Sequence, residues 1–285
     1  MVKQKDLSSV PFFIVTHNRL SGLINALDFL RNQDFPVRIV IADMKSSYPP
    51  MLSYLDSLDL NENLQVWNCE NIGPRGLYFD SRFRSFVRAN RGNFFLADGD
   101  LDYSNTSTNL LSELVGVSKH FPGFRKVGAG LQLDDLPDQP DALRAKSQII
   151  RSGEKRNFLE TREVGKNIFL APLDTTVAYY PRLTKTYYFW PSLRVGGGCL
   201  VRHMPWYEDD ANLTPEQSFY LINQRRDIST MGGRQLLESE GPERLLVDRL
   251  AFAIKPLLRS FPASGSRILA FAIKSTNRNS YLKNT

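Results

Sequence analysis

Two carboxylates stand two residues apart in the segment Asp98-Gly99-Asp100, directly after the apolar run Phe94 to Ala97. A short apolar run bounded by polar residues predicts a buried strand, and the two acids then fall at its carboxyl end. Carboxylates this close repel one another unless a cation lies between them, and hard oxygen ligands suit Mg²⁺ or Mn²⁺. Asp-Gly-Asp is also a common surface turn. Its position after a buried strand favours a metal site formed by Asp98 and Asp100.

Polar residues follow the other predicted strands of the first half as well. Strands are expected at Pro11 to Thr16, Val37 to Ala42 and Leu64 to Trp67, and helices at Leu20 to Leu30, Met51 to Leu58 and Tyr78 to Ala89. Strands that alternate with helices predict an α/β fold with a mostly parallel central sheet flanked by helices. Ligands bind outside the carboxyl ends of the strands in such sheets. The residues at those ends are Thr16, His17, Asn18, Arg19, Asp43, Asn71, Gly73, Arg75, Asp98 and Gly99.

The second half has strand-like runs with fewer helices between them, which predicts mixed or antiparallel strands at the end of the sheet. These runs are Lys126 to Leu133, Asn167 to Leu173, Thr175 to Tyr180 and Leu193 to Arg202. A helix is expected to begin near Thr214, because Thr214 can cap it and Pro215 fits its first turn. We divide the chain into a catalytic domain at 1–233 and a basic helical C-terminal extension at 234–285.

Residues 10 to 103 contain four motifs that are weak singly but occur in a characteristic order. Thr16-His17-Asn18-Arg19 follows the first strand, Asp43 the second, and Asn71-Ile72-Gly73 the third, while Arg91-Gly92 precedes Phe94 to Asp100. This order resembles the donor-binding half of GT-A glycosyltransferases, especially the inverting family-two group. Asp43-Met44-Lys45-Ser46-Ser47 departs from that group's usual "D-D-G-S", and residues 104 to 285 do not follow its catalytic half.

The resemblance implies a Rossmann-like GT-A fold and a hexosyltransferase activity of EC class 2.4. A sugar would pass from a nucleotide-sugar donor, which we expect to be UDP-linked, to a glycan or lipid-linked acceptor. The cation, Mn²⁺ or Mg²⁺, would bridge the donor diphosphate to Asp98 and Asp100. Asp43 would contact the nucleobase, as the acidic residue at that point does in the family. The expected setting is the synthesis of a bacterial surface polysaccharide such as lipopolysaccharide.

His203 is the expected third metal ligand. It follows the glycine-rich stretch Gly196 to Arg202 and begins His203-Met204-Pro205-Trp206, which loosely resembles the "H-x-x-x-K-P-W" segment that completes the metal site in several GT-A enzymes. The alternative is a surface histidine beside a structural Trp206. A phosphate contact is also consistent with this position.

An inverting transferase needs a general base to deprotonate the attacking hydroxyl. Asp174 and Asp209 are the two candidates of comparable weight, and each has a structural alternative, as a turn residue or as a helix-start acid. Other candidates for the base are Asp134, Asp135, Glu208 and Asp210. The candidates for pairing with the diphosphate, since the guanidinium suits its oxygens, are Arg75, Arg194 and Arg202.

The net charge of +6 is concentrated at the end of the chain, because nine basic and four acidic residues follow position 233. This basic extension either lies on an anionic membrane or packs on the catalytic domain with a solvated basic face. No signal peptide or membrane span is expected, which predicts a cytoplasmic protein. If the basic extension lies on an anionic membrane, the protein is expected to be peripheral at the inner face of that membrane. Nucleic acid is not an expected partner, since the extension has no recognised nucleic-acid-binding motif. Cys69 and Cys199 are expected to be core thiols.

Two other function classes fit an α/β chain of this kind. One is a nucleotide-sugar-binding module without transfer activity, against which the intact pair Asp98 and Asp100 argues. The other is a sugar-nucleotide nucleotidyltransferase. That class needs a glycine-rich basic segment after the first strand, and Thr16 to Leu20 contains no glycine.

Overall fold

A ten-stranded sheet forms the centre of the chain in the computed structural model, which describes residues 10–73, 76–90, 93–137, 154–158, 162–173, 176–181, 192–209 and 212–223. The strands are β1 (Pro11–Thr16), β2 (Arg38–Asp43), β3 (Leu64–Asn68), β4 (Phe94–Asp98), β5 (Leu101–Asp102), β6 (Lys126–Leu131), β7 (Glu163–Gly165), β8 (Ile168–Leu170), β9 (Ala178–Tyr180) and β10 (Ser192–His203). The helices are α1 (Leu20–Arg31), α2 (Pro49–Asp56), α3 (Gly76–Phe79), α4 (Ser81–Asn90), α5 (Leu110–His120) and α7 (Pro215–Asn223).

The sheet is parallel in its first half and mixed beyond it. Its order is β3-β2-β1-β4-β9-β6-β10-β8-β7, with β5 paired to β10. The pairs β3-β2, β2-β1 and β1-β4 are parallel, whereas β9 runs antiparallel to both β4 and β6. Among the described strands beyond β4, parallel pairing returns between β6 and β10 alone. The α/β class is therefore confirmed, but the expectation of a mostly parallel sheet holds only for the N-terminal half.

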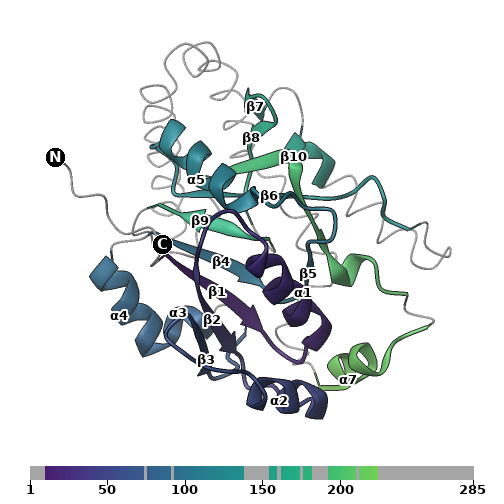
Figure 1. The fold of residues 1–285 in the computed structure, drawn as a ribbon. Helices are drawn as coiled ribbons and strands as arrows, with labels where there is room; N and C mark the ends of the chain where they lie inside the picture. Colours follow the sequence, from purple (N-terminus) through teal and green to yellow (C-terminus); the bar gives the residue numbers. More distant parts are fainter. Residues whose placement is uncertain are drawn as a thin grey trace, which may run out of the picture.

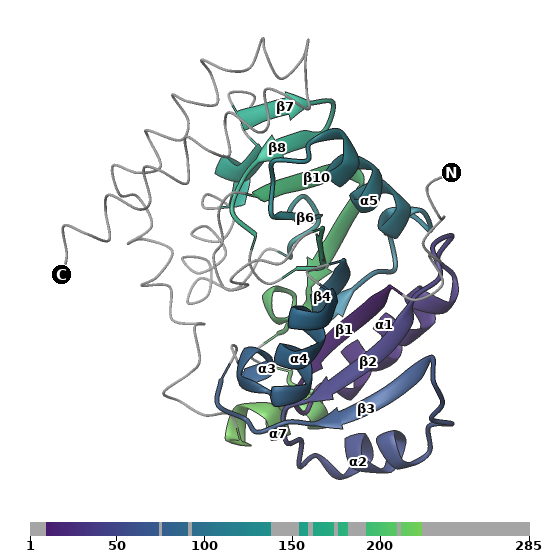
Figure 2. The same ribbon diagram turned by 90° about the vertical axis from the view of Figure 1, so that its left-hand side faces the viewer.

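Side chains alternate along the strands and form two separate hydrophobic cores, one on each face of the sheet. On β1, Phe12 and Ile14 join one core, and Phe13 between them joins the other. This alternation follows from the two-residue period of a strand. The first core also takes buried residues from α1, α2 and α5, and the second from α3 and α4. Figures 1 and 2 show these helices as layers on either side of the strands.

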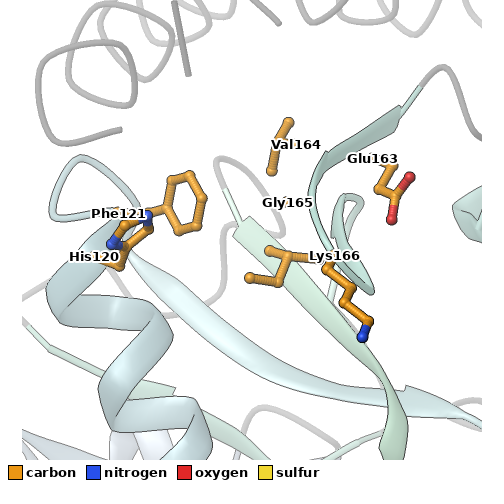
Figure 3. A pocket seen from close by; sticks show the side chains of 7 residues that line it. His120, Phe121, Glu163, Val164, Gly165 and Lys166 are labelled. Carbon is orange, nitrogen blue, oxygen red and sulfur yellow. The ribbon is translucent and has the colours of Figure 1, made fainter. Parts of the chain in front are cut away.

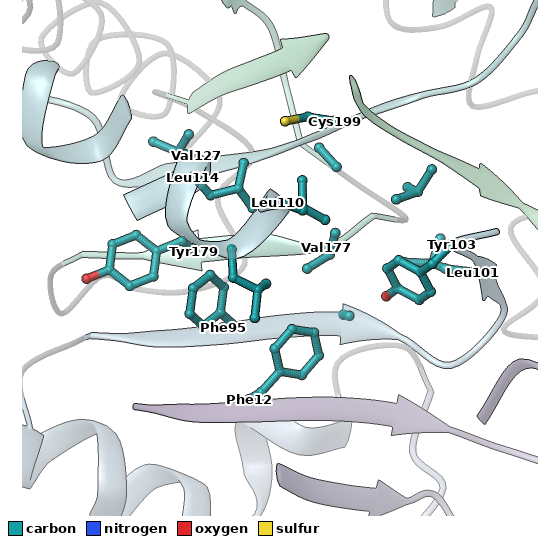
Figure 4. Close-up of a cluster of buried hydrophobic side chains, with 14 of the residues drawn as sticks. Phe12, Phe95, Leu101, Tyr103, Leu110, Leu114, Val127, Val177, Tyr179 and Cys199 are labelled. Atoms are coloured by element: carbon teal, nitrogen blue, oxygen red, sulfur yellow. The ribbon is translucent and has the colours of Figure 1, made fainter. Parts of the chain in front are cut away.

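Aromatic rings fill both cores. On the α1 and α5 side, Phe12 stacks on Phe95 with ring centroids 5.7 Å apart, and Phe95 lies 4.9 Å from Tyr179 of β9 (Figure 4). On the other side, Phe13 has four aromatic neighbours, among them Phe83 at 5.0 Å. Burial of such rings is a leading source of folding free energy. The strands that end at the predicted site are thus held rigidly from both faces.

The structure tests two predictions of helices. The helix expected at Tyr78 to Ala89 is wrong as a single element, because α3 and α4 are separated at Asp80. The Asp80 carboxylate accepts hydrogen bonds from Arg82 N (2.8 Å) and Phe83 N (3.3 Å), which caps the start of α4. The start of α7 is confirmed, since Gln217 N donates to Thr214 Oγ1 at 3.2 Å and Thr214 N to Gln217 Oε1 at 2.8 Å.

The cysteine prediction is confirmed, because Cys69 and Cys199 are both free and buried. None of the helices within the described residues has both the length and the apolar run that a membrane crossing needs. The helical extension expected at 234–285 lies outside the described residues, as does the boundary at 233.

Candidate metal and donor site

The carboxyl ends of the parallel strands lie side by side, as the α/β reading requires. Thr16 pairs with Asp43, the last residue of β2, and Val15 pairs with Asp98, the last residue of β4. Thr16, Asn18, Arg19 and Asp43 are all buried. Buried polar side chains are costly unless they have partners. Their concentration at one edge of the sheet marks a built polar site there.

Asp100 and His203 come together although 103 residues separate them. Residues Asp98 to Asp100, which we call the acid turn, lead from β4 into β5, and Leu101 of β5 pairs antiparallel with His203 at the end of β10. His203 Nε2 lies 3.5 Å from Asp100 Oδ2, and Met204 N donates to the Asp100 carbonyl oxygen at 2.9 Å. The structure thus places the predicted third metal ligand beside the acid turn. The alternative of a surface histidine is wrong, because His203 is 7% exposed.

Several buried polar atoms around the acid turn have no hydrogen-bond partner among the described residues. They include Asp100 Oδ1, His203 Nδ1, Thr16 Oγ1 and Tyr103 Oη. More than nine in ten buried polar groups in proteins are paired, so a cluster of exceptions calls for an explanation such as an ion or ligand. An oxygen of one carboxylate and a nitrogen of an adjacent imidazole are both ligands that Mn²⁺ accepts.

The described residues contain no group of three or more His, Cys, Asp or Glu side chains already arranged around one point. Mg²⁺ and similar hard cations are usually held by one or two carboxylates, with waters and substrate phosphates completing the shell. Asp100 and His203, with Asp98 at the start of the same turn, fit a cation bound in this way. They do not form a complete protein cage.

The electrostatics couple Asp100 to His203. Burial raises the pKa of Asp100, but the His203 imidazole and the Arg19 guanidinium outweigh burial and lower it overall. Burial likewise lowers the pKa of His203, and the carboxylates of Asp100 and Asp98 reverse this and raise it. The pair therefore favours its charged form in the absence of a metal ion. A bound divalent cation would replace the imidazolium proton as the partner of the carboxylates.

Asp43 and Asn18 fix the two turns at the predicted nucleoside end. Both Asp43 carboxylate oxygens lie 3.2 Å from Ser46 N, which donates to them. Asn18 Oδ1 accepts from Ser47 N at 2.7 Å and Tyr48 N at 2.9 Å, and Asn18 N donates to Ser46 Oγ at 2.8 Å. Asp43 therefore makes a turn-capping contact with Ser46. An ionised carboxylate keeps further lone pairs with which to accept from a nucleoside.

His17 and Asn71 meet from the loops that follow β1 and β3. His17 Nε2 lies 3.2 Å from Asn18 Nδ2 and 3.4 Å from Asn71 Nδ2, and both amides can donate to it. Burial lowers the pKa of His17, which favours the neutral ring that accepts these bonds. Gly73 follows with φ of 99°, a conformation open to glycine, and its N–H points to Asn71 Oδ1 at 3.4 Å. Arg75 lies outside the described residues.

Sequence reasoning missed the part that α7 plays in this region. Glu216 of α7 accepts hydrogen bonds from Ser21 N (3.0 Å) and Ser21 Oγ (2.7 Å), and so caps the start of α1. Arg19, just before α1, forms an ion pair with Glu208, and the Tyr220 ring covers its guanidinium at 3.9 Å. Thr214 and Pro215 signalled the start of the helix, but nothing in the sequence signalled where the helix docks.

The remaining predicted residues are dispersed. Asp209 is exposed, and its Oδ2 accepts from Asn212 Nδ2 at 2.7 Å, as a turn residue would. Asp174 lies outside the described residues. Arg194 is 2% exposed and pairs with Glu154 at 2.7 Å, and Arg202 pairs with Asp102 and Asp135. Both arginines are thus engaged by carboxylates of the chain itself.

A pocket of about 500 Å³ lies away from the predicted site, between the end of α5 and the β7-β8 hairpin. Figure 3 shows His120 and Phe121 on one side and Glu163 and Lys166 on the other. None of the described residues that line it is a predicted metal or donor ligand. The pocket lies near the start of β6, whereas the acid turn follows the end of β4, which is parallel to β6.

No known protein-family profile and no curated protein sequence matches this chain. Among solved structures, the mannosyltransferase PcManGT of Pyrobaculum calidifontis, in complex with GDP-Man and Mn²⁺, is similar at 14% identity and a TM-score of 0.43, over 95% of this chain and 75% of that one. S. aureus TarS 1–349 in complex with UDP is similar at 16% identity and a TM-score of 0.30, over 47% of this chain and 39% of that one. Similarity at these levels assigns neither a family nor an activity to the chain.

Proposed function

We propose that the protein is a metal-dependent glycosyltransferase that uses a nucleotide-sugar donor. The observation that carries the proposal is the meeting of Asp100 and His203 at the carboxyl edge of the parallel strands, each with a buried polar atom that lacks a partner. A divalent cation bound beside Asp100 and the His203 imidazole would give Asp100 Oδ1 a partner and bring a diphosphate to this edge, where nucleotides bind in parallel α/β sheets.

Each residue of the site has a distinct proposed role. Asp98, Asp100 and His203 hold Mn²⁺ or Mg²⁺, which neutralises the charge that develops on the diphosphate leaving group. Thr16 Oγ1, buried beside the acid turn and unpaired among the described residues, is placed to donate to a diphosphate oxygen. Gly99 keeps the turn close to Thr16, since a Cβ at position 99 would lie 2.6 Å from the Thr16 Cβ.

The nucleoside half of the donor is assigned to the two loops that follow β1 and β2. Asp43 accepts from a base N–H or a ribose hydroxyl with the lone pairs that Ser46 leaves unused. Asn18 holds the two turns in place and His17 presents a neutral ring beside them. The ligands named for the similar solved structures are GDP-Man and UDP, which serve as first probes. We retain UDP-linked sugars as the expected donor class.

The acceptor side rests on the sequence alone. We propose a hexosyl transfer with inversion, as in the family-two group, onto a glycan or lipid-linked acceptor of a bacterial surface polysaccharide. Asp209, exposed on the segment that leads from His203 to α7, is one proposed base, and Asp174 is the other. The basic extension at 234–285 would hold the enzyme at the cytoplasmic face of the membrane, where a lipid-linked acceptor lies.

Hydrolysis of nucleotide sugars without an acceptor tests the proposal. The purified chain should release nucleoside diphosphate slowly from at least one UDP- or GDP-sugar when Mn²⁺ is present. Chelation with EDTA should abolish this release, and His203→Ala should reduce it at least tenfold while the melting temperature shows a folded protein. Release that is equal with and without metal, or absent for all donors that bind, would contradict the proposal.

A further inference from the structure

Arg19 places a positive charge beside the acid turn. It lies at the start of α1, and Gly22, one helical turn later, packs directly against Gly99. The Arg19 side chain is buried, and its charge acts on both Asp100 and His203. A guanidinium in this position competes with a metal ion for the same carboxylates, and the competition is strong where water is excluded.

Two side chains from the segment after His203 hold the guanidinium in place. Arg19 Nη1 donates to Glu208 Oε1, and the two side chains are 7% and 9% exposed. The ring of Tyr220 lies over the same guanidinium, 3.9 Å from its carbon. An arginine fixed on two sides in this way is not free to turn toward Asp100. The sequence predicts that Arg19 contacts the donor, but in the structure its side chain is already bound by Glu208 and Tyr220.

The net charge of Asp98, Asp100, Glu208 and Arg19 matches the charge of a divalent cation. Asp98 and Asp100 contribute two negative charges, and the charges of Glu208 and Arg19 cancel one another. Without Glu208, the carboxylates would face one uncompensated positive charge. The Arg19 side chain would also be released to pair with Asp100.

We propose that Glu208 is a positioning residue of the metal site, which neutralises Arg19 and keeps its guanidinium away from Asp100. The inference rests on the proposed function, because it assumes a cation at Asp100 and His203. It gives Glu208 a role other than that of a catalytic base. It also explains why a buried carboxylate occurs on the segment that carries the third ligand.

Binding of Mn²⁺ alone, measured by calorimetry on the full chain at neutral pH without nucleotide, tests this role. Glu208→Gln should weaken Mn²⁺ binding about tenfold, through the charge that it leaves uncompensated. The matched control is Glu216→Gln, which removes a carboxylate contact between α7 and Ser21 and leaves the Arg19 pair intact. It should change Mn²⁺ affinity less than about twofold, although the melting temperature falls as a helix cap is lost.

The double variant Arg19→Met/Glu208→Gln separates positioning from structure. It removes both charges, so Mn²⁺ affinity should return to within about threefold of the wild type. Equal losses in the two glutamine variants, or a double variant as weak as Glu208→Gln alone, would overturn the inference. If Glu208→Gln does not fold, the double variant decides the matter, since buried ion pairs often tolerate joint replacement. A loss of tenfold or more in the double variant would then reject the role.

Failure of the proposed function gives a different result. In that case wild-type Mn²⁺ binding itself would be absent, or unchanged by Asp98→Ala/Asp100→Ala. Failure of the Glu208 inference leaves wild-type binding dependent on the acid turn but insensitive to Glu208.

Discussion

Gly22 of α1 and Gly99 of the acid turn are in direct contact, because a Cβ built at position 22 would lie 2.1 Å from the Gly99 carbonyl oxygen. The same Cβ would lie 3.1 Å from the Asp100 Cα. Glycine in a helix interior costs stability relative to alanine, so its presence here reflects the close approach. The first turn of α1 therefore sets the position of the acid turn relative to His203.

Gly22→Ala should displace the acid turn. We expect a loss of about 1–3 kcal/mol in the free energy of unfolding, from overpacking against backbone, together with weaker Mn²⁺ binding. Gly116→Ala in α5 is the control, since a Cβ there meets nothing within 4 Å. It should stabilise the protein by about 0.5–1 kcal/mol through helix propensity. Denaturant unfolding measures both variants, and a similar response in the two would refute the packing argument.

Asp43→Asn should weaken nucleotide binding more than it destabilises the fold. The amide keeps one oxygen for Ser46 N but loses the charge, and a hydrogen bond to a charged group contributes about 1.5–3 kcal/mol. Calorimetry with UDP and GDP gives the affinity per folded molecule, and a thermal melt gives the stability.

Ser46→Ala is the matched control for Asp43, because it removes the bond from Asn18 N and loosens the same turn while the carboxylate stays. It should lower the melting temperature with little change in affinity. If Asp43→Asn behaves in the same way, Asp43 only caps the turn.

The ion pair between Asp80 and Arg82 predicts a pH-dependent stability. Hydrogen bonds from the Arg82 side chain hold the pKa of Asp80 at about 2, against the burial that raises it. Because the folded pKa lies below the unfolded value of 3.8, the stabilisation is present above pH 4 and is lost as the pH falls toward 2. Asp80→Asn should therefore cost about 2 kcal/mol at pH 7, by the conversion of a pKa shift to free energy.

The Asp80 variant and the wild type should converge in unfolding free energy as the pH falls to 2 and below. Asp28→Asn provides the comparison, since Asp28 and Arg31 form an exposed pair on α1. Exposed ion pairs contribute little to stability. Asp28→Asn should therefore change the free energy of unfolding little at neutral or at acidic pH. A constant difference between Asp80→Asn and the wild type would show that ionisation of Asp80 does not stabilise the fold.

The first half of the fold was predictable because its strands are apolar runs bounded by polar residues. Phe12 to Ile14 and Phe94 to Ala97 are buried on both faces, and such strands carry a strong local signal. The short antiparallel β9 lies within the predicted run Thr175 to Tyr180, in the half where mixed or antiparallel strands were expected. Two-residue β5 depends on pairing with β10, which is distant in the sequence, so local pattern did not reveal it. The helix α5 (Leu110–His120) was missed despite its apolar face.

The site was predictable where it follows strand ends, and not where distant elements meet. Asp98 and Asp100 were proposed as metal ligands from their position after a strand, and His203 from its resemblance to a family segment. The structure places His203 against Asp100. The ion pair of Arg19 with Glu208 and the docking of Tyr220 depend on how α7 folds back onto α1. Neither residue type nor spacing specifies that arrangement.

Truncation after Gly233 tests the membrane hypothesis, which rests on the charge count of the sequence. The shortened chain loses five net positive charges and should bind vesicles that contain anionic lipid more weakly, by about 1 kcal/mol for each charge near the surface. Its affinity for nucleotide should change little. Equal sedimentation of both chains with anionic vesicles would remove the membrane reading.

On the proposed function, the acid turn binds a nucleoside diphosphate through a divalent cation. Calorimetric titration of UDP and GDP, with and without Mn²⁺, tests it on the wild type and on Asp98→Ala/Asp100→Ala. The control Asp59→Ala/Glu62→Ala removes two exposed acids and makes the same change in net charge. We predict Mn²⁺-dependent binding to the wild type and the control, and none to the acid-turn variant with its fold intact. Equal Mn²⁺-dependent binding by all three proteins would contradict the claim.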